Sequence, residues 1–408
     1  MRTWGGLVGG FTVALVATGA SIACGDDDPA GAAPDAGVEG SGSSSGDGGG
    51  ADGASSSSSG GTSGAPLVAW SVLGEAVSEG AVKSVARDDT HVFISSTGTG
   101  AHAGSHVEKR RLSDGQLETG FGDGGYVALP PSSFITVDAT AIYVASLDLT
   151  LRKLAKADGA QLWENVDETG KAAARGIAVD ASGVYVAAAT FTAGFGSWVA
   201  MKLALDTGAV LPAFKPSLPN VFGGTSPRAI VRGKAALFIG GDIANSSSAP
   251  TNYAWRVQAL DPETGASRWD EEDDPTQYSD TLRDVAVTDT HVYAIIRDYS
   301  TGAKALAWDA ANGTALVGFK PAVKDDPYRL ATAGGAVYLG SLTGVRAVDP
   351  ASGAATGACT FKEKQSSLEE ILPPAAPGAA PVVVVGTTRP GDAGTPLLLS
   401  IEGCVIAP

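Results

Sequence analysis

The feature that most constrains the fold is a short apolar strand built around an aromatic residue, which occurs six times along the chain. The central residues are Phe93, Tyr143, Tyr185, Phe238, Tyr293 and Tyr338. An all-aliphatic relative, Val383-Val384-Val385, follows the sixth copy, and consecutive centres lie 50, 42, 53, 55, 45 and 46 positions apart. A period of this length, made only of short strands and turns, predicts an all-β protein with the architecture of a β-propeller.

A second apolar strand follows each aromatic strand and ends in a turn that begins with Asp and closes with Gly. The Asp side chain caps such a turn, and Gly adopts the positive φ that it needs. A large aromatic residue then follows, as packing between neighbouring sheets requires. The turn glycines are Gly115, Gly159, Gly208, Gly265, Gly313 and Gly353, and the aromatic residues after them are Phe121, Trp163, Phe214, Trp269 and Phe319.

One unit shows the expected blade in full. Residues 284–287, 291–296 and 303–308 are predicted as its first three strands, and residues 316–319 as the fourth. Four antiparallel strands form one propeller blade. No segment shows a sustained apolar period of 3.6 residues, so no substantial helix is expected after the N-terminal segment.

Seven such units fit between residues 66 and 408 at an average of 49 residues each, so we predict seven four-stranded blades, with six or eight as alternatives. The segment from Leu67 to Trp70 precedes the first unit but resembles the last strand of a blade. We expect it to pair with the C-terminal blade and close the ring, which would leave no exposed sheet edge there.

The first 23 residues have the features of a secretory signal peptide, with Arg2 followed by an apolar run from 7 to 16. They end in Ser21-Ile22-Ala23-Cys24, which resembles the lipobox of bacterial lipoproteins. That resemblance implies that Cys24 is lipidated and becomes the mature N-terminus. Residues 24–65 then consist of the lipidated Cys and a tether rich in Gly, Ser, Ala and Asp, which has too few apolar residues to form a core.

Two further cysteines fall towards the ends of the last two units. An exported protein rarely keeps unpaired thiols, so we predict a disulfide between Cys359 and Cys404. The disulfide would close a loop of about 46 residues, which on the chain-entropy account contributes about 4 kcal/mol of stability. Two unpaired buried thiols are the alternative.

The formal net charge is −16, of which the tether carries −7 and the predicted propeller about −10 once the signal peptide is removed. An acidic surface argues against nucleic acid and against docking on anionic lipid. The acidic run from 270 to 274 lacks the spaced ligands and central Gly of a calcium loop. We therefore predict a solvated loop between blades, and no metal site.

The chain has only four histidines. His91 and His291 occupy the same place in two units, which indicates a structural position at the start of a strand. His102 and His106 flank a Gly-rich segment, but two histidines without further ligands indicate zinc only weakly. No catalytic residue and no cofactor are assigned from the sequence.

The turn-and-Trp segments at 158–163 and 261–269 resemble pyrroloquinoline-quinone-type (PQQ-like) propeller repeats, and residues 112–122 resemble the delta-60 type of bacterial surface repeat. The resemblance covers roughly 66–361 and implies a propeller fold. Quinone dehydrogenases of this superfamily carry adjacent cysteines over the cofactor. This chain has no Cys-Cys pair, so quinone binding is not expected.

The anchored propeller is also similar to the propeller lipoprotein of the outer-membrane assembly machinery, and its tether resembles those of predicted myxobacterial lipoproteins. These resemblances imply a monomeric, non-catalytic binding or scaffold module on the bacterial cell envelope. It would be anchored to the outer membrane, at its periplasmic face or the cell surface, with a protein or glycan partner. A carboxylate-based hydrolase or lyase acting on a glycan is the alternative, and a quinoprotein oxidoreductase comes third.

Overall fold

A computed structural model describes thirteen segments of the chain, all of which belong to a compact unit running from Thr62 to Pro408. In these segments the regular structure is all strand, and we find no helix long and apolar enough to cross a membrane. The segments are 67–73, 80–98, 103–166, 172–192, 195–218, 226–244, 253–272, 280–323, 326–333, 335–360, 365–372, 382–388 and 395–402.

The strands of these segments form seven antiparallel sheets, each ordered from a first strand outwards. The first strands are β2 (Gly80–Arg87), β6 (Phe134–Val137), β10 (Ala172–Asp180), β13 (Pro227–Arg232), β17 (Asp280–Val287), β20 (Arg329–Ala333) and β24 (Gln365–Leu372). The second strands are β3 (His91–Gly98), β7 (Ala141–Ala145), β11 (Gly183–Thr192), β14 (Leu237–Ala244), β18 (His291–Asp298), β21 (Ala336–Ser341) and β25 (Val382–Thr388).

The third strands are β4 (Gly104–Arg111), β8 (Thr150–Ala155), β12 (Phe195–Leu203), β15 (Tyr253–Leu260), β19 (Gly302–Asp309), β22 (Gly344–Val348) and β26 (Thr395–Glu402). The outermost strands are β5 (Tyr126–Ala128), β9 (Gln161–Val166), β16 (Ser267–Glu272), β23 (Ala355–Thr360) and β1 (Leu67–Leu73).

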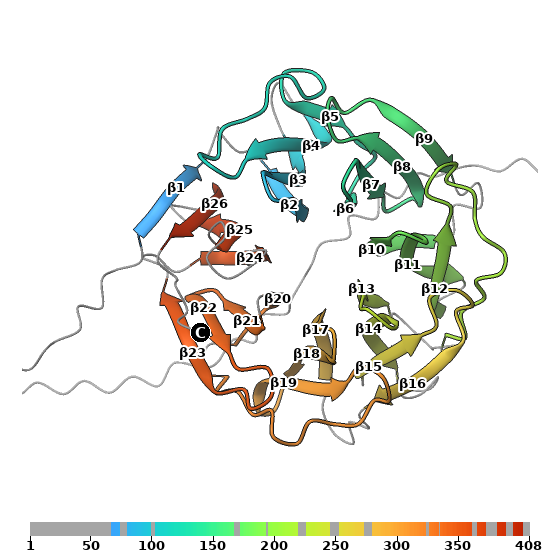
Figure 1. Cartoon of the computed structure of the whole chain (residues 1–408), viewed down its shortest axis with the longest axis vertical. Coiled ribbons are helices and arrows are strands. Elements are labelled where there is room, and N and C mark those ends of the chain that lie inside the picture. Colours follow the sequence, from blue (N-terminus) through green and yellow to red (C-terminus); the bar gives the residue numbers. More distant parts are fainter. Residues whose placement is uncertain are drawn as a thin grey trace, which may run out of the picture. The chain divides into compact units, whose positions relative to one another are not determined.

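The first strands face one another around a common axis (Figure 1). Each contacts the first strands of the two neighbouring sheets, and β24 contacts β2, so the succession of sheets closes into a ring. Radially arranged antiparallel sheets around a central axis are the defining arrangement of a β-propeller. The predicted fold class is confirmed.

The ring is closed by strand β1, which lies antiparallel to β26 from Leu67 opposite Glu402 to Leu73 opposite Leu397. The sheet order β1-β26-β25-β24 therefore joins the first strand of the unit to its last three. This pairing confirms the expected role of the segment that begins at Leu67, and it covers the edge that β26 would otherwise expose.

The prediction of a fourth strand at residues 316–319 is wrong. The sheet β17-β18-β19 has three strands among the described residues, and the outer segment makes only one bridge, between Trp308 and Ala315. The chain then turns inward, because the Phe319 amide donates to the Leu316 carbonyl at 3.0 Å. This turn brings the Phe319 ring to 5.1 Å from the Tyr293 ring, and packing of the ring replaces a strand ladder.

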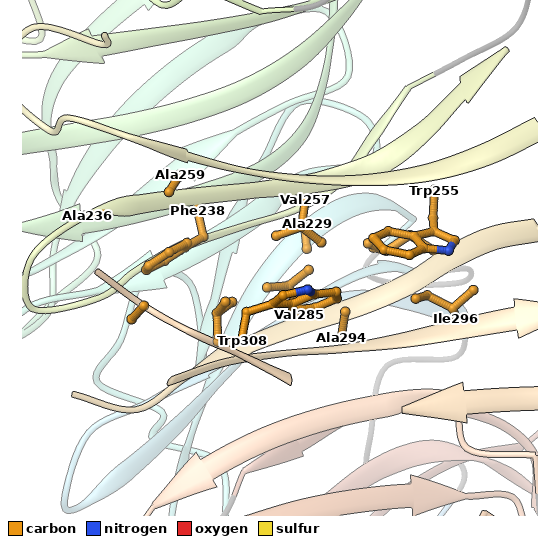
Figure 2. Packing of buried hydrophobic residues seen from close by; sticks show 13 residues of the cluster. Ala229, Ala236, Phe238, Trp255, Val257, Ala259, Val285, Ala294, Ile296 and Trp308 are labelled. Atoms are coloured by element: carbon orange, nitrogen blue, oxygen red, sulfur yellow. The ribbon is translucent and has the colours of Figure 1, made fainter. Parts of the chain in front are cut away.

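The core lies between the sheets, and the second strands contribute most to it. The aromatic residues at the centres of β3, β7, β11, β14 and β18 are at most 1% exposed. Figure 2 shows one such interface, where Phe238 and Trp255 lie over Val285 and Trp308 of the next sheet. The Trp255 and Trp308 rings are 5.5 Å apart between centroids. The repeated aromatics are therefore structural, as the sequence indicated.

The turn glycines complete these interfaces. All six predicted turn glycines adopt positive φ, between 69° and 77°. A Cβ placed on Gly208 would lie 2.6 Å from the Trp163 ring of the preceding unit, and one on Gly313 would lie 2.9 Å from Trp269. The turns at Gly208 and Gly313 thus need Gly for two reasons, the backbone conformation and the close approach of a neighbouring indole.

Substituting one of these glycines should weaken the ring. We expect Gly208→Ala to lower the free energy of unfolding by about 1–3 kcal/mol more than a control substitution, because the new methyl group must displace the Trp163 ring. Gly124→Ala is the matched control, since its φ of +63° is similar and no atom lies within 4 Å of the position that an added Cβ would take. Urea unfolding followed by tryptophan fluorescence measures both, and equal losses would contradict the packing role.

Candidate functional site

The inner strands carry a repeated irregularity. In β2, β10, β13 and β17 the register with the second strand shifts across one extra residue. That residue is basic in all four sheets: Lys83, Arg175, Arg228 and Arg283. A bulge of this kind locally redirects a side chain.

The fifth basic residue of this kind is Arg329, which opens β20 without a bulge and lies opposite Gly340. Gly340 is two residues past the aromatic of its strand, and the four bulges fall between the second and third residues past theirs. The five basic residues therefore lie at the same height along the axis, to within about one residue. We call these five residues the basic level.

A cavity of about 520 Å³ lies on this axis, lined by residues from the first strands of all seven sheets. Its described lining contains six basic residues and one acidic residue, Asp284. The six are the five residues of the level just described together with Arg87. We call this cavity the axial cavity. Its walls are positively charged in a chain that has a net negative charge.

Arg228 is fixed by a buried carboxylate. Its Nε donates to Asp242 Oδ2 at 2.8 Å, and the Arg228 side chain is 52% exposed whereas that of Asp242 is 4% exposed. The other oxygen, Asp242 Oδ1, accepts from the Leu282 amide of the next inner strand at 2.8 Å. Burial raises the pKa of Asp242, and the Arg228 charge opposes that rise. Asp242 thus holds Arg228 within its own sheet and links that sheet to the next one through Leu282.

Arg283 is held from two sides. Its guanidinium lies 4.0 Å from the centre of the Tyr328 ring, and its Nη1 donates to Asp326 Oδ1 at 3.0 Å. Stacking and an ion pair together restrict a guanidinium to one orientation.

The single described carboxylate of the lining, Asp284, is used by the backbone. Its Oδ1 accepts from the Val285 amide and its Oδ2 from the Leu330 amide, each at 2.8 Å. Burial raises the pKa of this carboxyl, and the charge of Arg329 opposes the rise. Asp284 therefore connects β17 to β20, and the described lining brings no second carboxylate next to it.

Lys83 and Arg87 both come from β2. The Lys83 residue is exposed. Arg87 Nη1 is buried and has no hydrogen-bond partner within the described residues. Burial lowers the pKa of Arg87, against the charges of Asp89 and Asp88, but an arginine remains protonated. Four residues of strand separate the two side chains by about 13 Å along the axis.

The predicted structural position of two histidines is confirmed. His91 and His291 are the first residues of β3 and β18, and each ring lies close to the aromatic two residues later, at 6.3 Å and 6.2 Å. Each Nδ1 is within hydrogen-bond distance of the hydroxyl of the preceding threonine, at 2.8 Å and 2.9 Å. They belong to the turn before the strand, away from the lining of the axial cavity.

The remaining histidine and acidic predictions have mixed outcomes. His106 is buried on β4, with Nε2 3.2 Å from Ser96 Oγ, while His102 lies outside the described residues. The acidic run was predicted as a loop, but residues 270–272 are part of strand β16. Asp270 and Glu272 both pair with Arg256 of the adjacent strand β15, at 2.9 Å and 2.8 Å, so two charges of the acidic run are used in ion pairs.

In the described part of the chain no group of three His, Cys, Asp or Glu side chains could hold a metal ion. Residues 273 and 274 are outside that part, as are Cys24 and Cys404. Cys359 lies in β23, but its side chain is not among those described. The predicted lipidation and the predicted disulfide therefore stay predictions.

The basic level of the axial cavity was missed by the sequence analysis, although a signal for it exists. Lys83, Arg175, Arg228 and Arg283 each precede the strand aromatic of their unit by ten residues, and Arg329 precedes Tyr338 by nine. The shorter spacing is explained by the missing bulge in β20. A search for repeated basic residues relative to the aromatics would have found the level.

Comparison with known proteins supports the fold and goes no further. No protein-family model matches the chain, and no curated protein matches it. Among solved structures, the WD40 domain of Pan2 from Neurospora crassa is similar, with a TM-score of 0.54 and 9% identity over 82% of this chain and 95% of that one. At this identity the likeness shows a β-propeller fold alone.

Two further structures match at lower scores. The computationally designed protein Ika8 has a TM-score of 0.49 and 12% identity, over 81% of this chain and 99% of that one. BamB from Moraxella catarrhalis has a TM-score of 0.45 and 15% identity, over 82% of this chain and 86% of that one.

The turns before the second strands give a prediction for stability against pH. Partial burial acts to raise the pKa of Asp88, but hydrogen bonds from Lys156 and from the Thr90 and His91 backbone outweigh it and leave the pKa well below its ordinary value. Lys156 Nζ lies 2.8 Å from Asp88 Oδ2 and joins two neighbouring sheets. A depressed pKa in the folded state means stability that is present above the ordinary carboxyl pKa and is lost as the pH falls below it.

We expect Asp88→Asn to lower the free energy of unfolding at pH 7 by up to about 1 kcal/mol, because Asn keeps the turn but loses the ion pair. The difference from the unsubstituted protein should shrink as the pH falls below about 4, where the aspartate of the unfolded chain becomes protonated while that of the folded protein stays ionised. Asp89→Asn, at the exposed neighbouring position, is the control. Urea unfolding at several pH values measures the difference, and a pH-independent loss would count against the ion pair.

Proposed function

We propose that this protein is a lipid-anchored β-propeller that acts as a binding or scaffold module on the bacterial cell envelope, without catalysis. The observation that supports the binding role is the axial cavity of about 520 Å³, which all seven inner strands line. Its volume falls in the range of about 300–1,000 Å³ typical of ligand sites.

The repeated aromatics, turn glycines and turn aspartates support binding at the axial cavity rather than at the repeat itself, because they are already used in the scaffold. The aromatics fill the interfaces between sheets, and the turn glycines accommodate them. Three of the turn-opening aspartates, Asp114, Asp158 and Asp309, cap the amide two residues later at 2.9–3.0 Å. The repeated aromatic, glycine and aspartate residues therefore serve the scaffold, and the axial cavity is the better candidate for the binding site.

The anchor is the second part of the proposal, and it is supported by the sequence. Residues 1–23 would act as a signal peptide, and Cys24 would carry the lipid. The tether that follows would span roughly 35 Å on average as a flexible coil and at most about 140 Å when extended. Such a tether would hold the propeller away from a bilayer, and two or more acyl chains would make the attachment stable.

The anchor is tested by Cys24→Ser. This variant should move from the membrane fraction to the soluble fraction when the protein is expressed in a bacterial host, because the acylated thiol is lost. Cys359→Ser is the matched control, since it makes the same substitution at a cysteine of the propeller, where it would break the predicted disulfide but leave the membrane fraction unchanged. Retention of the Cys24→Ser protein in the membrane fraction would refute lipidation at this residue.

A further inference from the structure

We propose that the axial cavity binds a multivalent oxyanion, a small molecule that carries two or more phosphate or carboxylate groups. The inference names a ligand class for the binding role proposed above and rests on that role, but it does not depend on the lipid anchor.

The first argument is the contrast in charge between the cavity and the chain. The whole sequence has 28 basic and 44 acidic residues, yet the described lining has six basic residues and one acidic residue. In β24 a bulge one residue nearer the strand centre carries Glu369, whose side chain is not among those described. Even when Glu369 is counted with Asp284, basic residues outnumber acidic ones six to two. A cavity with one sign of charge and low-dielectric walls concentrates the opposite ion.

The second argument is the arrangement of the cations. The five residues of the basic level come from five different inner strands and share one level around the axis. A ligand on the axis therefore meets positive charge from several sides at once, which a single negative group would not use fully. Several oxyanion groups on one molecule match this arrangement.

The third argument is the residue type. Four of the five residues at this level are arginines, Lys83 being the exception. The planar guanidinium presents parallel N–H donors that fit the oxygens of phosphate and carboxylate, and it is desolvated more readily than an ammonium group.

The fourth argument is that parts of the level are already ordered. Arg283 is stacked on Tyr328, and Arg228 is held by the buried Asp242. Both oxygens of Asp284 accept backbone amides, which directs this carboxylate towards the scaffold. These side chains have already lost conformational entropy on folding, so ordering them does not add to the cost of binding a ligand, and the affinity is higher.

The proposal is tested by isothermal titration calorimetry on the purified full-length protein in a non-ionic detergent. The probes are tripolyphosphate and citrate, with a neutral trisaccharide as the control ligand. We expect the anions to bind, the trisaccharide not to bind, and the affinity for the anions to fall as sodium chloride is added, because salt screens the charges.

Lys83→Gln should weaken anion binding about tenfold, which is the size expected for one hydrogen bond to a charged group. Lys83→Arg should retain most of the affinity, because it keeps the charge. Lys320→Gln is the matched control: Lys320 is exposed and does not line the axial cavity, and the substitution makes the same change in net charge. A thermal melt of each variant verifies that the propeller is still folded.

Binding of both anions, or of one alone, with loss in Lys83→Gln and not in Lys320→Gln would support the proposal, and a preference would identify the oxyanion. Absence of binding by both probes, or equal loss in the two glutamine variants, would overturn it, even if an acidic peptide bound instead. The anchor is judged separately, because release of the Cys24→Ser protein from membranes does not depend on anion binding. Failure of this inference would leave the anchored propeller in place, and failure of lipidation would leave the axial cavity in place.

Discussion

The structure depends above all on the packing of each sheet against the next around the ring. A single four-stranded sheet cannot bury both of its faces, so every sheet needs a neighbour on each side. The Trp163 indole shows how this need is met, because it packs on Tyr143 of its own unit and lies against Gly208 of the following one. The same indole donates from Nε1 to the Leu205 carbonyl at 3.0 Å, so its polar atom is also satisfied by the neighbour. Each interface thereby fixes the position of the next.

Closure follows from the same requirement. A succession of sheets joined only to their sequence neighbours would leave two faces and an edge exposed. The pairing of β1 with β26 and the contact of β24 with β2 remove both of these exposures in the described part of the chain. The inner strands are then forced together around the axis, which explains why residues almost 250 positions apart in sequence, such as Lys83 and Arg329, share one level.

Much of this fold could be predicted from the sequence, because its determinants are local and repeated. The turn glycines and the buried aromatics recur at nearly fixed spacing, and each carries its own physical meaning. The outer strand at residues 316–319 could not be predicted in this way. Whether that segment forms a ladder or turns inward depends on the space that Tyr293 leaves for Phe319, which is a property of the packed interface. Residues 270–272 were misread for a similar reason, since their partner Arg256 lies on another strand.

The candidate site was hidden from the sequence by a different cause. A basic residue such as Arg175 reads as a solvated charge unless the register of its strand is known, and the bulge that carries it is visible only from its pairing with β11. The negative net charge of the chain also argued against an anion site, because an average over the whole chain conceals a local excess of basic residues. The spacing to the aromatics contained the information, but it becomes meaningful only once the inner strands are known to meet.

Like charges held around one axis also repel one another. Two such charges roughly 10 Å apart repel by about 1.7 kcal/mol at an effective dielectric constant near 20, so an uncompensated level would weaken the ring. The structure offsets part of this repulsion with Asp242, which pairs with Arg228, and with Asp326, which pairs with Arg283. Asp242 and Asp284 also accept amides from the next inner strand, so the carboxylates that lower the repulsion are themselves links between sheets. Neither Asp242 nor Asp326 is among the residues that line the axial cavity, so its described lining remains rich in basic residues.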